Sequence, residues 1–321
     1  DGSIIDEWYG GLTFFSPRWI DPTDPTQVWY KPGDTPGFVL AEVDYEAGTW
    51  SVKETHNIGG KAAGLARGPG NRGKFHVRYH DGERYLVGES FPPMIFHHTD
   101  GRLEPVVMGN NQRKFSNKEA RIIAELKGEA DPGQWVEQTF GKKRRDLNTY
   151  LWTDRNGDRE PQFEEIELTK LGNVYHGPRN GPSIGQAFDV IVTGGDYNPN
   201  RGQPGETNFY SAILRLAPTG WEDGVPRYEL PEKVADIAVA PIYTQPRDEE
   251  YGGRAQVYHT YQDRQGALYA FYHWGKKTGT GFPNSHAGRY ARLTRWTADG
   301  KRLWSVGRKA SGATGAPIFW N

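Results

Sequence analysis

A strand–turn–strand pattern that returns along the chain constrains the fold more than any other feature of the 321 residues. Each copy has two segments in which apolar and polar residues alternate, joined by a turn rich in Gly and Asp. Asp-Gly suits such turns because Gly adopts positive φ freely and Asp tolerates it. The five hairpins begin at residues 38, 94, 151, 212 and 290, so their spacing runs from 56 to 78 residues.

This spacing leaves room for about four strands in each repeat. Further strand patterns precede the hairpins at residues 75–79, 84–88, 188–193, 257–261 and 267–273. Repeats of this period with four strands each are typical of β-propeller blades rather than of a sandwich. We therefore predict an all-β fold, a single β-propeller of four-stranded blades over residues 1–321.

Both ends of the chain resemble partial hairpins. Residues 1–8 match the second half of a hairpin, and residues 316–321 look like the start of another. Either the two ends meet to complete one blade, or the chain is a piece of a longer protein. Five full repeats and two remnants are few for a closed propeller, which favours the longer chain.

One segment departs from the β pattern. Ser116 and Glu119 form a capping box, in which each side chain can accept a hydrogen bond from a backbone N–H of the first helical turn. Residues 120–127 follow, and Gly128 then favours the end of a helix. We predict one short inserted helix here, and a strand over residues 121–126 is the alternative.

The composition excludes several classes of protein. The 39 basic and 40 acidic residues leave no net charge to attract nucleic acid or anionic lipid. The absence of Cys excludes disulfides, thiolate catalysis, zinc–thiolate sites and covalent c-type haem. No apolar run approaches the roughly 18 residues of a membrane helix. We therefore expect no nucleic-acid partner and no membrane span, and we interpret the basic run at residues 142–145 as a solvated loop.

Residues 151–166 carry the sharpest chemical signature. Oxygen-bearing side chains recur at loop positions 1, 3, 5, 7, 9 and 12, which is the spacing of a calcium-binding loop. Position 6 is Arg159, where a helical EF-hand has Gly, and the flanking segments 148–153 and 163–168 have strand patterns. We predict a structural Ca²⁺ ion in an EF-like loop that replaces the turn of a blade hairpin; a solvated acidic turn is the alternative. The predicted ligands are Asp154, Asn156, Asp158, Glu160 and Glu165.

Two stretches carry a family resemblance. Residues 152–158, Trp-Thr-Asp-Arg-Asn-Gly-Asp, with the later Glu164-Glu165, and residues 295–308 resemble the repeats of exported bacterial β-propellers of the broad NHL and quinoprotein-like kind. The resemblance implies a propeller with a calcium loop and an extracytoplasmic location, periplasmic or secreted. Such propellers serve as binding scaffolds, electron-transfer partners and enzymes, so the fold does not decide the activity.

A second group of residues is a candidate for catalysis. His259, Tyr261 and Arg254 lie on or beside the predicted strand 257–261, next to the predicted strand 267–273. Such a set could remove the proton α to a uronic carboxylate, with Arg neutralising the acid and His or Tyr moving the proton. The alternative, which we favour, is that these side chains only pack the blade interior.

The other histidines give no metal site by their spacing. His97 and His98 are adjacent, so alternation sends them to opposite faces of a strand and they cannot serve one site. His76 and His80 share a face but lie about 13 Å apart along a strand. We expect His56 in a loop, like His286, where only partners that the sequence does not reveal could make it a ligand.

Together these features predict a calcium-stabilised, extracytoplasmic binding or scaffold module. Its partner would be a protein or a carbohydrate ligand, within a larger chain or assembly. One alternative is a polysaccharide lyase that uses His259, Tyr261 and Arg254. A further alternative is a platform subunit of a redox complex that holds no covalent haem.

Overall fold

The computed structural model describes residues 18–32, 37–65, 75–111, 117–140, 149–169, 183–195, 211–230, 238–241, 254–275, 290–298 and 301–307. These residues form mostly antiparallel sheets, with three α-helices and one 3₁₀ turn. The chain divides into two compact units. Unit 1 holds residues 1–168 and 219–227, and unit 2 holds residues 169–218 and 228–321.

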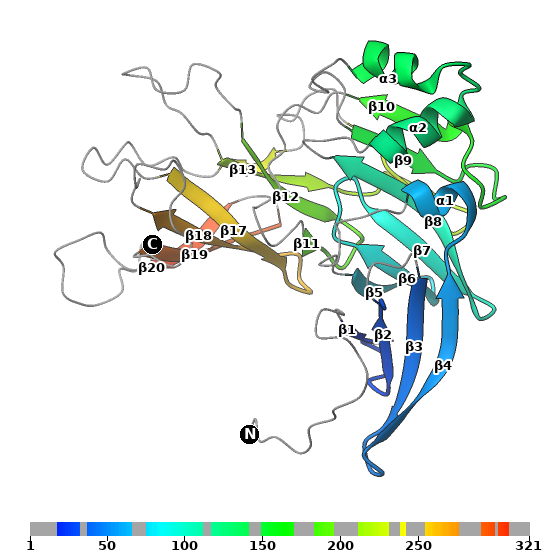
Figure 1. The fold of residues 1–321 in the computed structure, drawn as a ribbon. Coiled ribbons are helices and arrows are strands. Elements are labelled where there is room, and N and C mark those ends of the chain that lie inside the picture. The colour runs from blue at the N-terminus through cyan, green and yellow to red at the C-terminus, as the bar shows by residue number, and fades with distance from the viewer. Residues whose placement is uncertain are drawn as a thin grey trace, which may run out of the picture. The chain divides into compact units, whose positions relative to one another are not determined.

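The first sheet of unit 1 is a four-stranded meander, in which strands adjacent in the chain are adjacent in the sheet (Figure 1). Its strands are β1 Arg18–Ile20, β2 Gln27–Tyr30, β3 Gly37–Asp44 and β4 Thr49–Asn57. The turn between β3 and β4 ends at Gly48, whose φ of 64° lies in the left-handed region that Gly adopts without strain. The hairpin predicted at residues 38–54 is confirmed.

The second sheet has six strands in the order β10-β9-β8-β7-β6-β5. The strands are β5 Phe75–His80, β6 Glu83–Gly88, β7 Met94–Thr99, β8 Arg102–Asn111, β9 Thr149–Thr153 and β10 Ile166–Thr169. Asp-Gly pairs with positive φ at residues 81–82 and 100–101 make the two tight turns, as I′ hairpins require. These strands confirm the predictions at residues 75–79, 84–88 and 94–108.

The calcium-loop segment also lies between paired strands. β9 and β10 are neighbours in the sheet, as predicted for residues 148–153 and 163–168. The start of the second predicted strand is instead a 3₁₀ turn, η1 Phe163–Glu165, which places Glu165 among the buried residues.

Three helices accompany these sheets: α1 Gly60–Leu65, α2 Asn117–Leu126 and α3 Pro132–Phe140 (Figure 1). α2 confirms the helix predicted from the capping box. The prediction of one inserted helix was wrong, because α1 and α3 are also present. α3 had a readable signal: Pro132 takes the first helical position, and Asp131 accepts a hydrogen bond from the Gln134 backbone N–H at 2.9 Å. None of the described helices is long and apolar enough to cross a membrane.

The hydrophobic core of unit 1 joins both sheets and the helices. Phe38 of β3 meets Phe75 of β5 and Phe96 of β7 edge to face, with ring centroids 4.8 and 5.2 Å apart. Trp29 on β2 and Trp152 on β9 are both fully buried. The two sheets therefore face each other through aromatic side chains.

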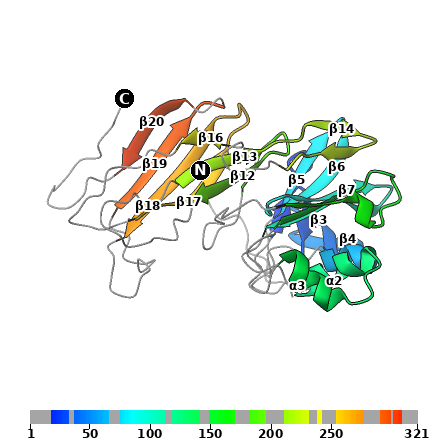
Figure 2. The same ribbon diagram turned by 90° about the horizontal axis from the view of Figure 1, so that it is seen from above.

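Unit 2 contains two four-stranded sheets, β11-β12-β13-β16 and β17-β18-β19-β20 (Figure 2). The strands are β11 Ser183–Ile184, β12 Val190–Gly195, β13 Ser211–Leu216, β16 Ala238–Pro241, β17 Arg254–Gln262, β18 Leu268–Gly275, β19 Tyr290–Trp296 and β20 Arg302–Gly307. The second sheet is a meander that confirms the strands predicted at residues 257–261 and 267–273 and the hairpin at 290–307.

The hairpin predicted at residues 212–230 was wrong. β13 pairs with β12 and β16, while β14 Gly220–Glu222 and β15 Val225–Arg227 form a separate two-stranded hairpin that belongs to unit 1. Its turn is Asp223-Gly224, both with positive φ, and not the earlier Gly220.

Contacts within unit 1 anchor this hairpin. Trp221 stacks on His80 with ring centroids 3.6 Å apart. The Tyr85 hydroxyl donates a hydrogen bond to the Gly224 carbonyl at 2.9 Å. Burial raises the pKa of Tyr85 to about 12, so this hydroxyl keeps its proton at neutral pH. Residues 1–8, 142–145, 276–286 and 316–321, on which several predictions fall, lie outside the described residues.

Candidate metal centre

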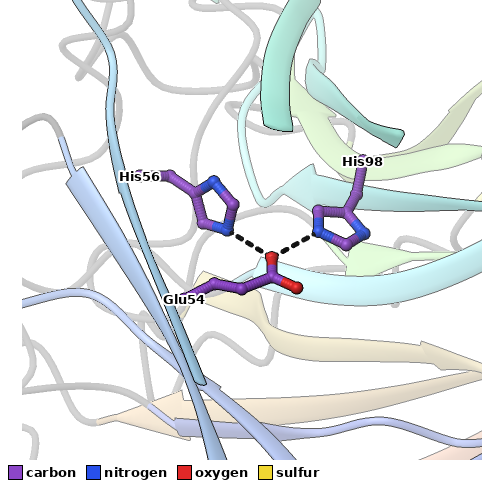
Figure 3. A group of neighbouring side chains, drawn as sticks. All are labelled: Glu54, His56 and His98. Carbon is purple, nitrogen blue, oxygen red and sulfur yellow. Dashed lines mark hydrogen bonds and ion pairs between the residues drawn. The ribbon is translucent and has the colours of Figure 1, made fainter. Parts of the chain in front are cut away.

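Two histidines and one glutamate from the facing sheets of unit 1 converge on one point (Figure 3). Glu54 and His56 are two residues apart on β4, so strand alternation places them on the same face. His98 comes from β7 of the other sheet. One ligand atom from each residue lies within 4.8 Å of the other two. Within the described part of the chain, no other three His, Cys, Asp or Glu residues meet in this way.

One oxygen of the Glu54 carboxylate contacts both histidines. Glu54 Oε2 accepts a hydrogen bond from His98 Nε2 at 2.7 Å. His56 Nε2 lies 2.9 Å from the same oxygen (Figure 3). That distance would suit a hydrogen bond, but the buried His56 Nε2 makes none of acceptable geometry. The contact is therefore short but poorly directed, and His56 Nε2 has no hydrogen-bond partner among the described residues.

Trp29 packs against both imidazoles. Its ring stacks on His56 with centroids 5.5 Å apart and an interplanar angle of 24°, and it meets His98 edge to face at 5.1 Å. Trp29 lies opposite Leu40, which lies opposite Glu54, so the three residues form one row across the first sheet. The fully buried Trp29 therefore restricts the orientation of the imidazoles from the core side.

The pKa values of two of the three residues are shifted toward the forms that a metal ion binds. Burial lowers the pKa of His56, an effect that Glu54 only partly offsets. Burial of Glu54 by itself raises its pKa, but the hydrogen bond from His98 and the charges of both histidines outweigh it, so the pKa is lowered. At neutral pH Glu54 is thus ionised and His56 neutral, as metal coordination requires.

The ligand set suits a divalent transition metal. Two His and one Glu, with a fourth position left for water or substrate, are found in catalytic zinc sites. Two His and one carboxylate also hold iron in some oxygenases. Ligand atoms about 2.1 Å from a tetrahedral zinc ion lie about 3.4 Å apart. The 2.7 and 2.9 Å separations here are shorter, so the ion would require the side chains to spread by roughly half an ångström.

The structure corrects one prediction and confirms another. His56 was expected in a loop, but it pairs with Phe38 as part of β4, and this placement brings it to Glu54. His97 and His98 do face opposite sides, as predicted: His97 stacks on Tyr85, with ring centroids 4.6 Å apart. The i, i+2 spacing of Glu54 and His56 was a readable signal once both lie on one strand, but no spacing points to His98, which is 44 residues from Glu54.

The other histidine pair has separate partners. His76 Nε2 lies 2.8 Å from Glu89 Oε1. His80 stacks on Trp221 of the β14–β15 hairpin. The two do not share a site, in agreement with the distance expected along β5.

The predicted calcium loop makes many hydrogen bonds of its own. Buried Asp154 accepts from the Gly157 backbone N–H at 3.0 Å and from the Arg159 guanidinium. Buried Glu165 accepts from Trp152 Nε1 at 2.8 Å and from the Arg155 backbone N–H at 2.7 Å. The protein itself thus satisfies the two buried carboxylates.

The remaining predicted ligands are exposed and bonded locally. Asn156 Oδ1 accepts from the Asp158 backbone N–H at 3.0 Å, and Asp158 Oδ1 accepts from that of Glu160 at 2.8 Å. Arg159, at loop position 6, has a φ of 64°. This is the left-handed conformation for which an EF-hand uses Gly, so the backbone turns where a calcium loop turns.

The three residues considered for catalysis all lie on β17. A one-residue irregularity between Val257 and His259 places positions 254, 259 and 261 opposite residues 275, 271 and 269, so the three positions share a face. Positions 259 and 261 are neighbours on that face, but position 254 lies about 20 Å from 261 along the strand. Tyr261 is exposed and tilts against Tyr269 at 6.1 Å.

Comparison with known proteins gives no family. No protein-family model and no curated protein sequence matches the chain. Among solved structures, a luciferin-regenerating enzyme shares 7% identity over 90% of this chain and 75% of its own, with a TM-score of 0.28.

Two further structures give similar values. A putative 6-phosphogluconolactonase from Bacteroides uniformis shares 11% identity over 94% of this chain and 83% of its own, with a TM-score of 0.26. A periplasmic gluconolactonase of Pseudomonas aeruginosa shares 13% over 95% and 87%, with a TM-score of 0.25. Similarities this low carry no argument about fold or activity, so the function is argued from the site alone.

Proposed function

We propose that the protein binds a divalent transition-metal ion, with zinc as the first candidate, through Glu54, His56 and His98. The observation that carries this proposal is the buried His56 Nε2 beside a carboxylate and a second imidazole; among the described residues it has no well-directed hydrogen-bond partner. An unpaired buried polar atom costs about 1–3 kcal/mol, and a metal ion would remove that cost. Solvent reaches the group beside Glu54, because the Glu54 side chain is 23% exposed and that of His56 only 5%.

The test is zinc titration of protein first treated with chelator, by isothermal calorimetry with metal analysis of the loaded sample. We expect one ion per chain in the wild type and none in His98→Ala. His97→Ala is the matched control, because His97 is the next residue but faces away from the site. A wild-type protein that binds no ion would contradict the proposal and leave Glu54 as a carboxylate shared by two imidazoles.

We also propose that the loop of residues 154–165 binds a calcium ion. The left-handed φ of Arg159 supports it, because the loop turns at the position where an EF-hand does. Calcium titration of chelator-treated protein should show a second, independent binding event that Asp158→Ala removes. No heat and no rise in melting temperature on adding calcium would contradict it.

Two features of the fold support a propeller. β1–β4 and β17–β20 are both four-stranded antiparallel meanders, the unit from which blades are built. From the sequence we also propose an extracytoplasmic location and a protein or carbohydrate partner. The lyase role of Arg254, His259 and Tyr261 is a further proposal that rests on the sequence. Measuring new ultraviolet absorbance from unsaturated products of uronic acid polymers tests the lyase role.

A further inference from the structure

We infer that the metal centre takes a carboxylate-bearing ligand, held between the open position of the metal ion and the guanidinium of Arg84. This inference rests on the proposed metal site and specifies its ligand.

Arg84 lies beside the site by strand register. On β6 it is directly opposite His98 of β7, so the two side chains leave the sheet on the same face with Cβ atoms about 5 Å apart. Tyr79 of β5 lies opposite Arg84 on the other side, which extends the same row. The Arg84 side chain is 18% exposed, so a small molecule from solvent can reach it.

The hydrogen bonds of Arg84 fix its Nε atom and leave its two terminal amino groups available. Nε donates to the Tyr79 hydroxyl at 2.9 Å and lies 3.1 Å from Asp21 Oδ2. Asp21 is almost fully buried and also accepts from the Tyr79 hydroxyl. The two terminal amino groups of Arg84 make no hydrogen bond with any residue that the structure describes. A guanidinium fixed at Nε with its terminal groups available matches the two oxygens of a carboxylate.

The charges favour an anion. The negative charge of Asp21 offsets the positive charge of Arg84. Glu54 offsets one of the two positive charges of a divalent ion, so the site with its ion carries one net positive charge. A single carboxylate would neutralise it. A neutral ligand would leave the charge partly buried, which is unfavourable.

Trp29 supplies an independent observation. Its indole N–H is fully buried and has no hydrogen-bond partner among the described residues, although the ring contacts both His56 and His98. Buried donors are nearly always paired with protein, water or ligand. A carboxylate that enters beside the two imidazoles would bring an acceptor close to this ring.

The experiment uses the full chain loaded with Co²⁺, whose visible absorption changes when a ligand enters its coordination shell. Acetate is titrated as the probe and acetamide as its neutral counterpart; galacturonate and galactose then test whether a sugar acid is favoured over a simple acid. We expect a spectral change with acetate and galacturonate only. Arg84→Gln should bind cobalt normally but weaken acetate at least tenfold, whereas Arg78→Gln, on the opposite face of β5, should not.

The outcomes separate this inference from the metal proposal. Cobalt binding without any acetate response, or equal acetate affinity in Arg84→Gln and wild type, overturns the carboxylate inference and leaves the metal site standing. Absence of cobalt binding overturns both. If Arg84→Gln does not fold, Arg84→Lys is the second variant, because it keeps the positive charge but lacks the planar guanidinium. It should still weaken acetate binding. Unchanged acetate affinity in Arg84→Lys counts against the inference.

Discussion

The two candidate metal regions of unit 1 differ in how the chain brings their ligands together. In the loop of residues 154–165 all candidate ligands follow one another within twelve residues, and most are exposed. In the group of Glu54, His56 and His98 the ligands come from two facing sheets, and 44 residues separate the outer two. A local site leaves a spacing in the sequence, whereas a site between sheets leaves none.

They also differ in how far the protein satisfies them. Arg159, Trp152 and backbone N–H groups occupy the buried oxygens of the loop. In the other group no described residue makes a well-directed hydrogen bond to the buried His56 Nε2. An ion would therefore replace existing bonds at the loop but complete a missing one between the sheets.

The largest effect is expected on zinc affinity. Glu54→Gln should weaken zinc binding more than about 100-fold, because removing a direct ligand should exceed the roughly 10- to 100-fold effect of removing a group that only supports one. Asp154→Asn should leave zinc affinity unchanged. Calorimetric titration with zinc measures both, and equal losses in the two variants would show that the regions are not separate sites.

The same Trp→Phe substitution, made beside each of the two regions, compares the hydrogen bonding of their buried tryptophans. Trp152→Phe removes the donor to buried Glu165, whereas Trp29→Phe removes an N–H that has no hydrogen-bond partner in the part of the chain that the structure describes. Since both rings are fully buried, the packing losses should be similar. We expect Trp152→Phe to lower the free energy of unfolding by about 1–3 kcal/mol more than Trp29→Phe. Urea denaturation in chelator checks this, and equal losses would contradict the contrast.

Arg159 should limit calcium binding at the loop. Arg159→Gly removes the guanidinium from Asp154 and relieves a left-handed residue, which by itself is worth about 1 kcal/mol. We expect calcium affinity to rise about tenfold, because the ion no longer displaces a charged hydrogen bond at Asp154, which contributes roughly 1.5 kcal/mol. Zinc affinity should not change. A calcium titration in which wild type and variant are identical would show that Arg159 does not compete with the ion.

The smallest effect is expected from pH. The pKa values of His56, through burial, and of Glu54, through His98, are both lowered in the folded protein, so the unfolded chain binds more protons on acidification. Their stabilising contribution is complete above pH 6.5 and declines as pH falls through the folded pKa values. Metal-free wild type should therefore lose more stability between pH 7 and 4 than His56→Gln. Urea midpoints measured across that range provide the check, and parallel curves would refute it.

The sequence predicted elements whose signals are local. Alternating strands joined by turns that contain Gly identified the hairpins at residues 38–54, 94–108 and 290–307, and the capping box identified α2. It failed at residues 212–230, because strand alternation does not show which strand is the partner. Asp223-Gly224 was the stronger turn signal, and using it would have separated β14 and β15 from β13.

The site was predictable only in part for the same reason. The face of His98 followed from alternation, but its proximity to Glu54 depends on how the two sheets pack. The placement of His56 failed because β4 continues as far as its pairing with β3 allows, and local sequence does not fix that length. Arg84 could not be recognised because its role depends on lying opposite His98 across two paired strands.

The β14–β15 hairpin determines how late in synthesis unit 1 can finish folding. Residues 219–227 belong to unit 1, while the residues on either side of them belong to unit 2. On the ribosome, unit 1 therefore cannot be finished when residue 168 emerges; Trp221 and Gly224 reach His80 and Tyr85 only after residues 169–218 have also been made. A polypeptide that stops at Leu168 would lack both contacts, so unit 1 cannot be produced whole without also making the part of unit 2 at residues 169–218.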